Sequence, residues 1–367
     1  MHAADLIRQR AARLTALLGV AHPIIGGPMA GVGTPALTAA VSRAGGLGAL
    51  GVGMMEPAAI AQAIEETRSL LGDSGRPFAV NLFVTPQPAA TAEVGEQLTR
   101  MIGRLARYRS ELGLPRARIP SVFAPDFDAQ FAAVLAGQVP VVSFTFGALD
   151  RARIDALHAQ GAKVIGTATC VREALELAGL GCDAIVASGI EAGGHRATFA
   201  VPFEASQVGL FALLPQVAAA VPVPVIAAGG VMTAQQVGAA LLLGASGVQL
   251  GSALLRTPES GASSAYKAAL EGLEDIGTRQ TRAFSGRPAR GVINRMMVEL
   301  ATVEGDIPPY PIQNKLTQEL RAEANRQGRT EFVSLWAGQA AALARAAPAA
   351  QIVRDMVAEL DALIGTH

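Results

Sequence analysis

The sequence predicts an α/β protein, a (β/α)8 TIM barrel with a second, mostly helical domain at the C-terminal end. Two observations predict the barrel: short apolar, β-branched runs alternate with alanine-rich helical patterns, and most of the runs end in glycine. A doubly wound open sheet is the competing architecture. Glycine-rich ends on at least six of the runs favour the closed barrel.

Eight segments have the length and composition of strands that are buried on both faces, as in a parallel sheet. Each is a short run of apolar residues bounded by turn-forming residues, and helical patterns separate most of them. The predicted strands cover residues 23–29, 47–52, 78–83, 139–144, 163–167, 184–187, 223–227 and 248–250.

Capping residues mark several of the predicted helices. Thr34 and Pro35 provide an N-cap and a first-turn proline for a helix over 36–44, and Thr233 caps a helix over 234–243. Further helical patterns cover residues 1–20, 91–112, 152–159, 314–327, 333–346 and 349–364.

The strand pattern also predicts how the chain divides. We expect residues 1–255 to form the barrel, with a helical insertion around 85–138 between the third and fourth strands. Residues 256–367 keep helical periodicity but contain few strand-like runs, so we expect a mostly helical domain that covers the barrel mouth.

Composition argues against several classes of function. The formal net charge is zero, so no basic stripe indicates nucleic-acid binding. No stretch approaches the roughly 20 apolar residues of a membrane helix, and no signal-peptide core is present, so we expect a cytoplasmic protein without a membrane partner. Cys170 and Cys182 form no zinc motif, and no metal site is expected. A homodimer stays open, because an apolar helix face serves a core or a subunit interface equally well.

The most informative segment is 187–196, where a strand-like run leads into Gly193, Gly194 and His195. Glycine allows backbone N–H groups to approach a bound ring or phosphate closely. Histidine is suited to proton transfer near neutral pH. His195 is therefore the candidate catalytic base, although a histidine in a glycine loop can also be purely structural.

Two later predicted strands end in a similar way, at Gly229-Gly230 and at Gly251-Ser252. In (β/α)8 barrels the loops after the seventh and eighth strands frequently form a phosphate site, where backbone N–H groups face the anion. Two such ends favour a phosphate-anchored cofactor over glycines that only permit tight turns. Asn81 is a polar residue inside an apolar strand, so its amide needs a partner, either a cofactor or neighbouring backbone.

Taken together, these segments resemble the nitronate monooxygenase family, formerly called 2-nitropropane dioxygenases, and its class I group. The resemblance implies a barrel with a helical domain and non-covalently bound FMN. It also implies oxidation of alkyl nitronates by O2 to a carbonyl compound and nitrite. The matching motifs lie at residues 28–31, 81–83, 143–147, 191–196, 227–230, 249–252, 284–291 and 336–339.

The resemblance also assigns roles to residues. His195 would face the substrate and remove the α-proton of a neutral nitroalkane, with a small molecule and O2 as the partners of the enzyme. FMN would be held by residues at the ends of five strands: Pro28, Met29, Ala30, Gly31, Asn81, Ser188, Gly193, Gly194, Ala228, Gly229, Gly230, Gln249, Leu250, Gly251 and Ser252.

The chain departs from the family pattern at two places. The family usually has glutamine at the position of Ser188, and a serine reaches roughly 2.5 Å less far. The family often has glutamine at the end of the first strand, where this chain has Gly26-Gly27. Both changes imply a reshaped cofactor side of the site.

Two other functions stay open at this point. An NAD(P)H-dependent FMN reductase of the enoyl-acyl-carrier reductase or quinone reductase type would share the barrel and a Gly-Gly-His loop. A flavin-binding accessory protein without turnover would share the cofactor site alone.

Overall fold

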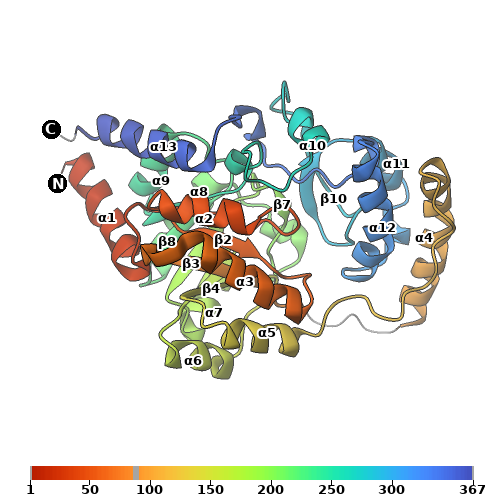
Figure 1. Ribbon diagram of the computed structural model, residues 1–367, viewed down its shortest axis with the longest axis horizontal. Coiled ribbons are helices and arrows are strands. Elements are labelled where there is room, and N and C mark those ends of the chain that lie inside the picture. Colours follow the sequence, from red (N-terminus) through yellow and green to blue (C-terminus); the bar gives the residue numbers. More distant parts are fainter. Residues whose placement is uncertain (1, 86–90, 366–367) are drawn as a thin grey trace.

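The computed structural model describes residues 2–85 and 91–365, so the predicted segments that include residues 1, 86–90 and 366–367 extend outside the described residues there. An eight-stranded parallel sheet lies at its centre, in the order β1-β9-β8-β6-β5-β4-β3-β2. A bridge between Ile25 and Leu47 joins the two ends of this order and closes the sheet (Figure 1). The predicted (β/α)8 barrel is therefore confirmed.

The barrel strands lie within a few residues of the predicted positions, because their apolar composition follows from burial on both faces. Every residue of the strands Gly48–Gly51, Ala184–Ser188 and Val225–Ala228 is buried. The first strand is shorter than the predicted 23–29, so Pro28 and Met29 lie in the loop that follows it. The strands are β1 (Ile24–Gly26), β2 (Gly48–Gly51), β3 (Phe78–Phe83), β4 (Val141–Thr145), β5 (Lys163–Ala168), β6 (Ala184–Ser188), β8 (Val225–Ala228) and β9 (Gly247–Leu250).

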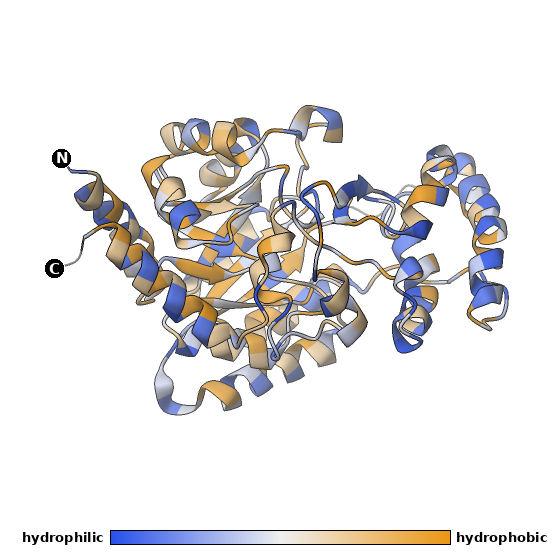
Figure 2. Ribbon diagram, turned by 90° about the horizontal axis from the view of Figure 1, so that it is seen from above, coloured by the Kyte–Doolittle hydropathy of each residue, from blue (hydrophilic) through white to orange (hydrophobic). Residues whose placement is uncertain are grey.

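Helices surround the barrel, and hydrophobic residues concentrate on the strands at its centre (Figure 2). The predicted caps are present: the Thr34 side chain accepts from the Leu37 N–H, and Thr233 forms a capping box with Gln236. The surrounding helices are α1 (Ala3–Leu18), α2 (Pro35–Arg43), α3 (Pro57–Leu71), α5 (Phe127–Ala136), α6 (Arg151–Ala159), α7 (Val171–Leu180), α8 (Leu210–Ala220), α9 (Ala234–Leu242) and α13 (Ala349–Leu363).

A second group of elements, which we call the outer lobe, lies beside the barrel and has its own hydrophobic core (Figure 1). Tyr108, Met296, Leu320 and Phe332 are among its buried residues. The outer lobe contains α4 (Ala92–Glu111), α10 (Ser264–Ala269), α11 (Arg295–Ala301), α12 (Ile312–Arg326) and the hairpin of β10 (Thr278–Thr281) and β11 (Ala289–Val292). The hairpin, which the sequence did not predict, pairs with the short β7 (Gly194–His195) from the barrel side.

The division of the chain at residue 255 stays a prediction. Two helices pack against the part of the molecule on the other side of that division. Helix α4 belongs to the insertion but packs against α12 of the tail. Helix α13 belongs to the tail but packs against α2 and α9, and its Ile352 and Val353 join the barrel core. Chain order and spatial grouping therefore differ for both helices.

The predicted helix over 333–346 is wrong. Only Ala341–Leu343 forms a 3-10 turn there, and the preceding residues run as an extended loop along β11. The backbone N–H of Ala337 donates to the carbonyl of Arg290, and that of Gln339 donates to the carbonyl of Glu191. These long-range hydrogen bonds replace the helical ones that the alanine-rich sequence favours.

The described residues contain neither a membrane-spanning helix nor a metal cluster. No helix in the described ranges combines the length and hydropathy needed to cross a membrane. Likewise, no group of three or more His, Cys, Asp or Glu side chains in those ranges is arranged to hold a metal ion.

Candidate active site

A cavity of about 520 Å³ opens at the carboxyl ends of the barrel strands. Its walls come from the loops after these strands, from α10 and α12, and from the segment around Trp336. Cavities of a few hundred to a thousand Å³ at this end of a (β/α)8 barrel are typical of sites for small molecules and cofactors.

Every predicted cofactor-binding residue except Leu250 lines this cavity, and so does His195. Leu250 is fully buried in the barrel core. Successive side chains of a strand point to opposite faces, so Gln249 and Gly251 face the cavity while the side chain between them points away. Ser188 lines the cavity and is nearly buried, and its carbonyl accepts from Arg196 Nη1 at 2.5 Å.

The amide of Asn81 is partly unsatisfied. Its Nδ2 donates to Ser143 Oγ at 2.9 Å and to Thr145 Oγ1 at 3.3 Å, whereas its Oδ1 is buried without a partner. A buried acceptor without a hydrogen bond is costly. Because Asn81 lines the cavity, this oxygen is available to a donor group on a ligand.

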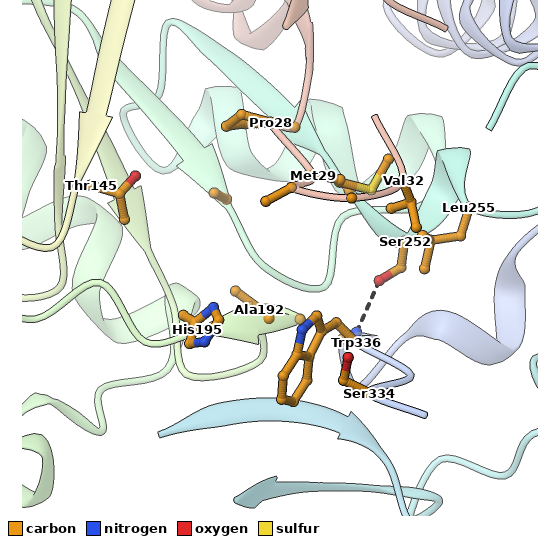
Figure 3. A pocket seen from close by; sticks show the side chains of 18 of the residues that line it. Pro28, Met29, Val32, Thr145, Ala192, His195, Ser252, Leu255, Ser334 and Trp336 are labelled. Carbon is orange, nitrogen blue, oxygen red and sulfur yellow. Dashed lines mark hydrogen bonds between the residues drawn. The ribbon is translucent and has the colours of Figure 1, made fainter. Parts of the chain in front are cut away.

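Glycines shape the cavity wall on the opposite side. Gly229 and Gly230 have φ values of 114° and 72°, in the left-handed region that favours glycine. A Cβ on Gly193 would lie 2.5 Å from the backbone nitrogen of Gly338, so only glycine allows the tail to approach. Ser252 Oγ then accepts from that Gly338 N–H at 2.9 Å (Figure 3). The serine hydroxyl keeps its own proton for a ligand.

Ser285 orients His195. The Nε2 atom of His195 lies 2.8 Å from Ser285 Oγ, and this hydroxyl is also 3.1 Å from the carbonyl oxygen of Arg287, to which it can only donate. A serine hydroxyl has one proton, so toward the imidazole it accepts. The neutral His195 therefore carries its proton on Nε2, and Nδ1 holds the free lone pair.

Aromatic rings surround the imidazole, which lies near Trp336 in Figure 3. The ring centroid of His195 is 5.3 Å from Phe146, 5.4 Å from Trp336, 5.8 Å from Tyr310 and 6.4 Å from Phe83. Phe83 ends β3, Phe146 follows β4, and the other two rings come from the tail. The histidine is thus enclosed by apolar edges on several sides.

The charge state of His195 follows from this enclosure. Burial, together with the smaller effect of the positive charges of Arg287 and Arg321, lowers the pKa of His195 to about 3. The imidazole is therefore neutral at neutral pH and able to accept a proton.

The two arginines are half-buried and have no carboxylate partner in the described part of the chain. Arg287 donates from Nε to the carbonyl of Arg196 at 3.1 Å and from Nη2 to the carbonyl of Thr198. Arg321 donates to Asn314 and Ser334 and lines the cavity. Burial lowers the pKa of each guanidinium to about 10, so both remain charged and give the cavity a positive potential.

The residues beside His195 in the sequence do not orient its ring. Glu191 accepts from the Leu210 N–H at 2.9 Å, at the start of α8, and Arg196 donates to Ser188 and Ser206. The orienting residue is Ser285, which lies 90 positions away in the chain.

Sequence reasoning missed several residues that complete the site. Four of them, Phe146, Ser285, Arg287 and Trp336, lie in the sequence motifs at 143–147, 284–291 and 336–339, so part of the signal was present. Arg321 and Tyr310 had no such signal, because they reach the site through the packing of the outer lobe. The residues missed are Phe146, Ser285, Arg287, Tyr310, Arg321 and Trp336.

Comparison with known proteins agrees with this geometry. Residues 11–359 match the family model described as nitronate monooxygenase. The chain belongs to the nitronate monooxygenase family.

Individual members and neighbours are similar over nearly the whole chain. A probable nitronate monooxygenase of Staphylococcus aureus (strain JH9) is 40% identical over 353 residues, which cover 96% of this chain and 98% of that protein. The solved structure of nitroalkane oxidase from Streptomyces ansochromogenes has a TM-score of 0.85 at 40% identity, covering 95% of this chain and 98% of the other. FabK from Thermotoga maritima has a TM-score of 0.74 at 29% identity, with 96% of both chains covered.

Membership in the nitronate monooxygenase family makes the chain an oxidoreductase. The family and the nitroalkane oxidase neighbour together support oxidation of nitro compounds as its reaction.

Proposed function

We propose that the protein is an FMN-dependent nitronate monooxygenase that uses O2 to convert alkyl nitronates into a carbonyl compound and nitrite. In this proposal neutral nitroalkanes are also substrates, after His195 has removed their α-proton. The observation that carries the proposal is a neutral histidine that lines the cavity and is oriented by a hydroxyl group, close to two half-buried arginines that have no carboxylate partner in the described residues.

The residues of the cavity fit FMN. The unpartnered Asn81 Oδ1 matches the need of a flavin ring for an acceptor toward its ring N–H, and the glycine turns match a phosphate. We infer that Asn81, Met29 and Gly31 border the ring and that Gly230, Gly251 and neighbouring residues hold the phosphate. When bound, FMN would supply the electron transfer between substrate and oxygen, which protein side chains cannot perform.

The chain itself contributes proton transfer and electrostatics. With Nε2–H donated to Ser285, the Nδ1 lone pair of His195 is the site that accepts the α-proton. The resulting imidazolium would lie beside two guanidinium groups, which disfavour it in the absence of an anion. The nitronate formed in the same step supplies that negative charge, so proton removal and anion binding support one another.

The same charges favour a preformed nitronate over its neutral parent. A half-buried guanidinium without a carboxylate partner attracts an anionic ligand more strongly than an exposed one, because less water competes for it. The aromatic rings around His195 exclude water and offer an apolar surface to the alkyl part of the substrate. A small alkyl nitronate meets both requirements.

The test is oxygen uptake by FMN-reconstituted protein supplied with propyl-2-nitronate in the absence of NAD(P)H. We expect uptake with release of nitrite. Absence of both, in protein whose FMN content has been verified, would contradict the proposal.

The similarity to FabK favours one alternative, an NAD(P)H-dependent FMN reductase of the enoyl-acyl-carrier reductase or quinone reductase type. Anaerobic mixing with NADPH separates the two. Rapid bleaching of the flavin absorbance would support the reductase, and an unchanged spectrum would exclude it.

A further inference from the structure

Phe146 has an unusual backbone for its residue type. It follows directly after β4 and has φ = 79°, in the left-handed region, although it is a bulky residue and only 2% exposed. Gln138, the other non-glycine residue with positive φ in the described ranges, lies exposed in a turn. A buried phenylalanine in this conformation is a backbone outlier that surrounding structure must hold in place.

Val84, the residue directly after β3, holds this backbone in place. The Val84 N–H donates to the carbonyl of Thr145 at 2.9 Å, which extends the strand pairing to the residue before Phe146. A Cβ on the next residue, Gly147, would lie 2.6 Å from the Val84 carbonyl oxygen. The chain on both sides of Phe146 is therefore pressed against Val84, the residue that follows β3.

The strained backbone places the ring between two groups of the site. The Arg287 guanidinium lies 4.2 Å from the centroid of the Phe146 ring. His195 meets the same ring edge-to-face, with centroids 5.3 Å apart and an interplanar angle of 77°. Phe83 and Tyr310 pack against the ring at 4.4 Å and 5.7 Å.

We propose that Phe146 is the positioning residue for His195: its left-handed backbone inserts the ring between Arg287 and His195 and fixes the imidazole with Nε2 on Ser285. The ring excludes water between the Arg287 guanidinium and the neutral imidazole, and it limits rotation of the imidazole. The inference rests on the proposed role of His195 as base. It adds the reason why a strained conformation is kept at this position.

The groups facing His195 are known from each neighbouring element. Arg287 lies in the loop before β11, Arg321 on α12 and Tyr310 just before α12, and Ser285 accepts from the imidazole. None of these is a carboxylate, so removal of the Phe146 ring exposes His195 to water and leaves the two guanidinium groups. Added water raises the pKa of His195 toward its ordinary value.

Phe146→Leu tests the proposal, and Phe144→Leu is the matched control. Phe144 is fully buried two residues earlier on β4 and has no ring contact with His195. We expect Phe146→Leu to lower kcat for neutral nitroethane about tenfold or more, since misplacement of a catalytic group by about 1 Å is costly. Turnover of ethyl nitronate should change by less than about twofold, because no proton is removed from it. Phe144→Leu should leave the ratio of kcat for nitroethane to kcat for ethyl nitronate unchanged.

Nuclear magnetic resonance of 15N-histidine-labelled protein provides the second readout. The chain has five histidines, and His195→Asn identifies the resonance of His195. We expect a single Nε2–H tautomer in the unmodified protein, and in Phe146→Leu a mixture of tautomers with a titration midpoint at higher pH. An unchanged His195 spectrum and titration in Phe146→Leu would overturn the inference.

Backbone strain has its own signature. Phe146→Gly and Phe146→Ala both remove the ring, but only glycine adopts positive φ freely. We expect Phe146→Gly to unfold at a higher urea concentration than Phe146→Ala, and the reverse order would overturn the claim of strain. If the unmodified enzyme fails to consume nitroethane, the proposed function fails, whereas the resonance and unfolding measurements still decide the role of Phe146.

Discussion

At the scale of single residues, the proposed chemistry depends on one nitrogen atom of His195. Replacement by asparagine removes the Nδ1 base while keeping a polar side chain of similar size. We expect His195→Asn to lower kcat/KM for a neutral nitroalkane about 10²-fold or more, which is the usual contribution of a positioned base. Turnover of the preformed nitronate should fall only a few-fold. Steady-state nitrite release with both substrates measures this, and equal losses would contradict the proposed base.

Ser285 is the second residue whose replacement separates geometry from chemistry. Ser285→Ala removes the acceptor for Nε2–H, so the imidazole samples both tautomers and Nδ1 is no longer always free. We expect kcat for the neutral nitroalkane to fall about tenfold, since the net free energy of one hydrogen bond corresponds to a rate change of about this size. Ser285→Thr keeps the hydroxyl and is the control. Full activity of Ser285→Thr supports the tautomer argument. Full activity of Ser285→Ala refutes it.

Local sequence patterns predicted the parts of the site that lie at strand ends. Gly230 and Gly251 each follow from a short segment in which a strand ends in glycine, and Asn81 follows from a polar residue within an apolar strand. Ser285 and Arg321 could not be predicted in this way, because their roles depend on contacts between distant segments. The chain distance from His195 to Ser285 is 90 residues, and no local pattern reports such a pairing.

At the scale of elements, α13 is a test of which part of the molecule the tail stabilises. Ile352 is 3% exposed in the barrel core, whereas Leu363 at the end of the same helix is 55% exposed. We expect Ile352→Ala to reduce the free energy of unfolding by about 2–4 kcal/mol and Leu363→Ala to change it by less than about 0.5 kcal/mol. Urea unfolding followed by circular dichroism measures both. A small effect of Ile352→Ala would mean that α13 is not part of the cooperative barrel.

Elements were predictable where local and tertiary preferences agree. The helices after Thr34 and Thr233 begin at their predicted caps, because a side-chain hydrogen bond within three residues determines the start. The segment 333–346 was predicted as helix from its alanine content. It forms mostly a loop instead, because backbone hydrogen bonds to Arg290 and Glu191 outweigh the helix propensity of alanine there. The β10–β11 hairpin escaped prediction, because its first strand, Thr278–Thr281, is short and polar.

At the scale of the whole molecule, His195 couples the site to stability. The pKa of His195 is about 3 in the folded protein and about 6.5 in an unfolded chain. As pH falls from 6.5 toward 3, the unfolded state binds a proton that the folded state does not, so stability is lost over this window. Above pH 6.5 the contribution is constant.

We therefore expect the unmodified protein to lose up to about 2 kcal/mol more stability than His195→Asn between pH 7.5 and pH 5. Other titrating groups, including His22 whose pKa burial also lowers, are shared by the two proteins and cancel. Urea midpoints at the two pH values give the comparison. Parallel losses in both proteins would mean that His195 titrates normally in the folded state.

The closed barrel was the most predictable feature of the whole molecule, because repeated apolar runs specify it many times over. The cavity was only half predictable. Its barrel side follows from strand ends, but its outer wall is built by α10, α12 and the segment around Trp336, whose docking depends on contacts between the outer lobe and the barrel. The volume left for a substrate is determined by that docking.

Helices α1 and α13 bring the start and the end of the described chain together, on the side of the barrel away from the outer lobe (Figure 1). Arg8 Nη2 donates to the carbonyl of Ile364 at 3.4 Å, and both helices pack against α9. A short peptide could therefore join Ala3 to Leu363, and the chain could be reopened at a surface turn elsewhere. Such a circular permutant would keep the cavity intact, and a surface anchor or reporter fused next to α1 or α13 would point away from entering substrate.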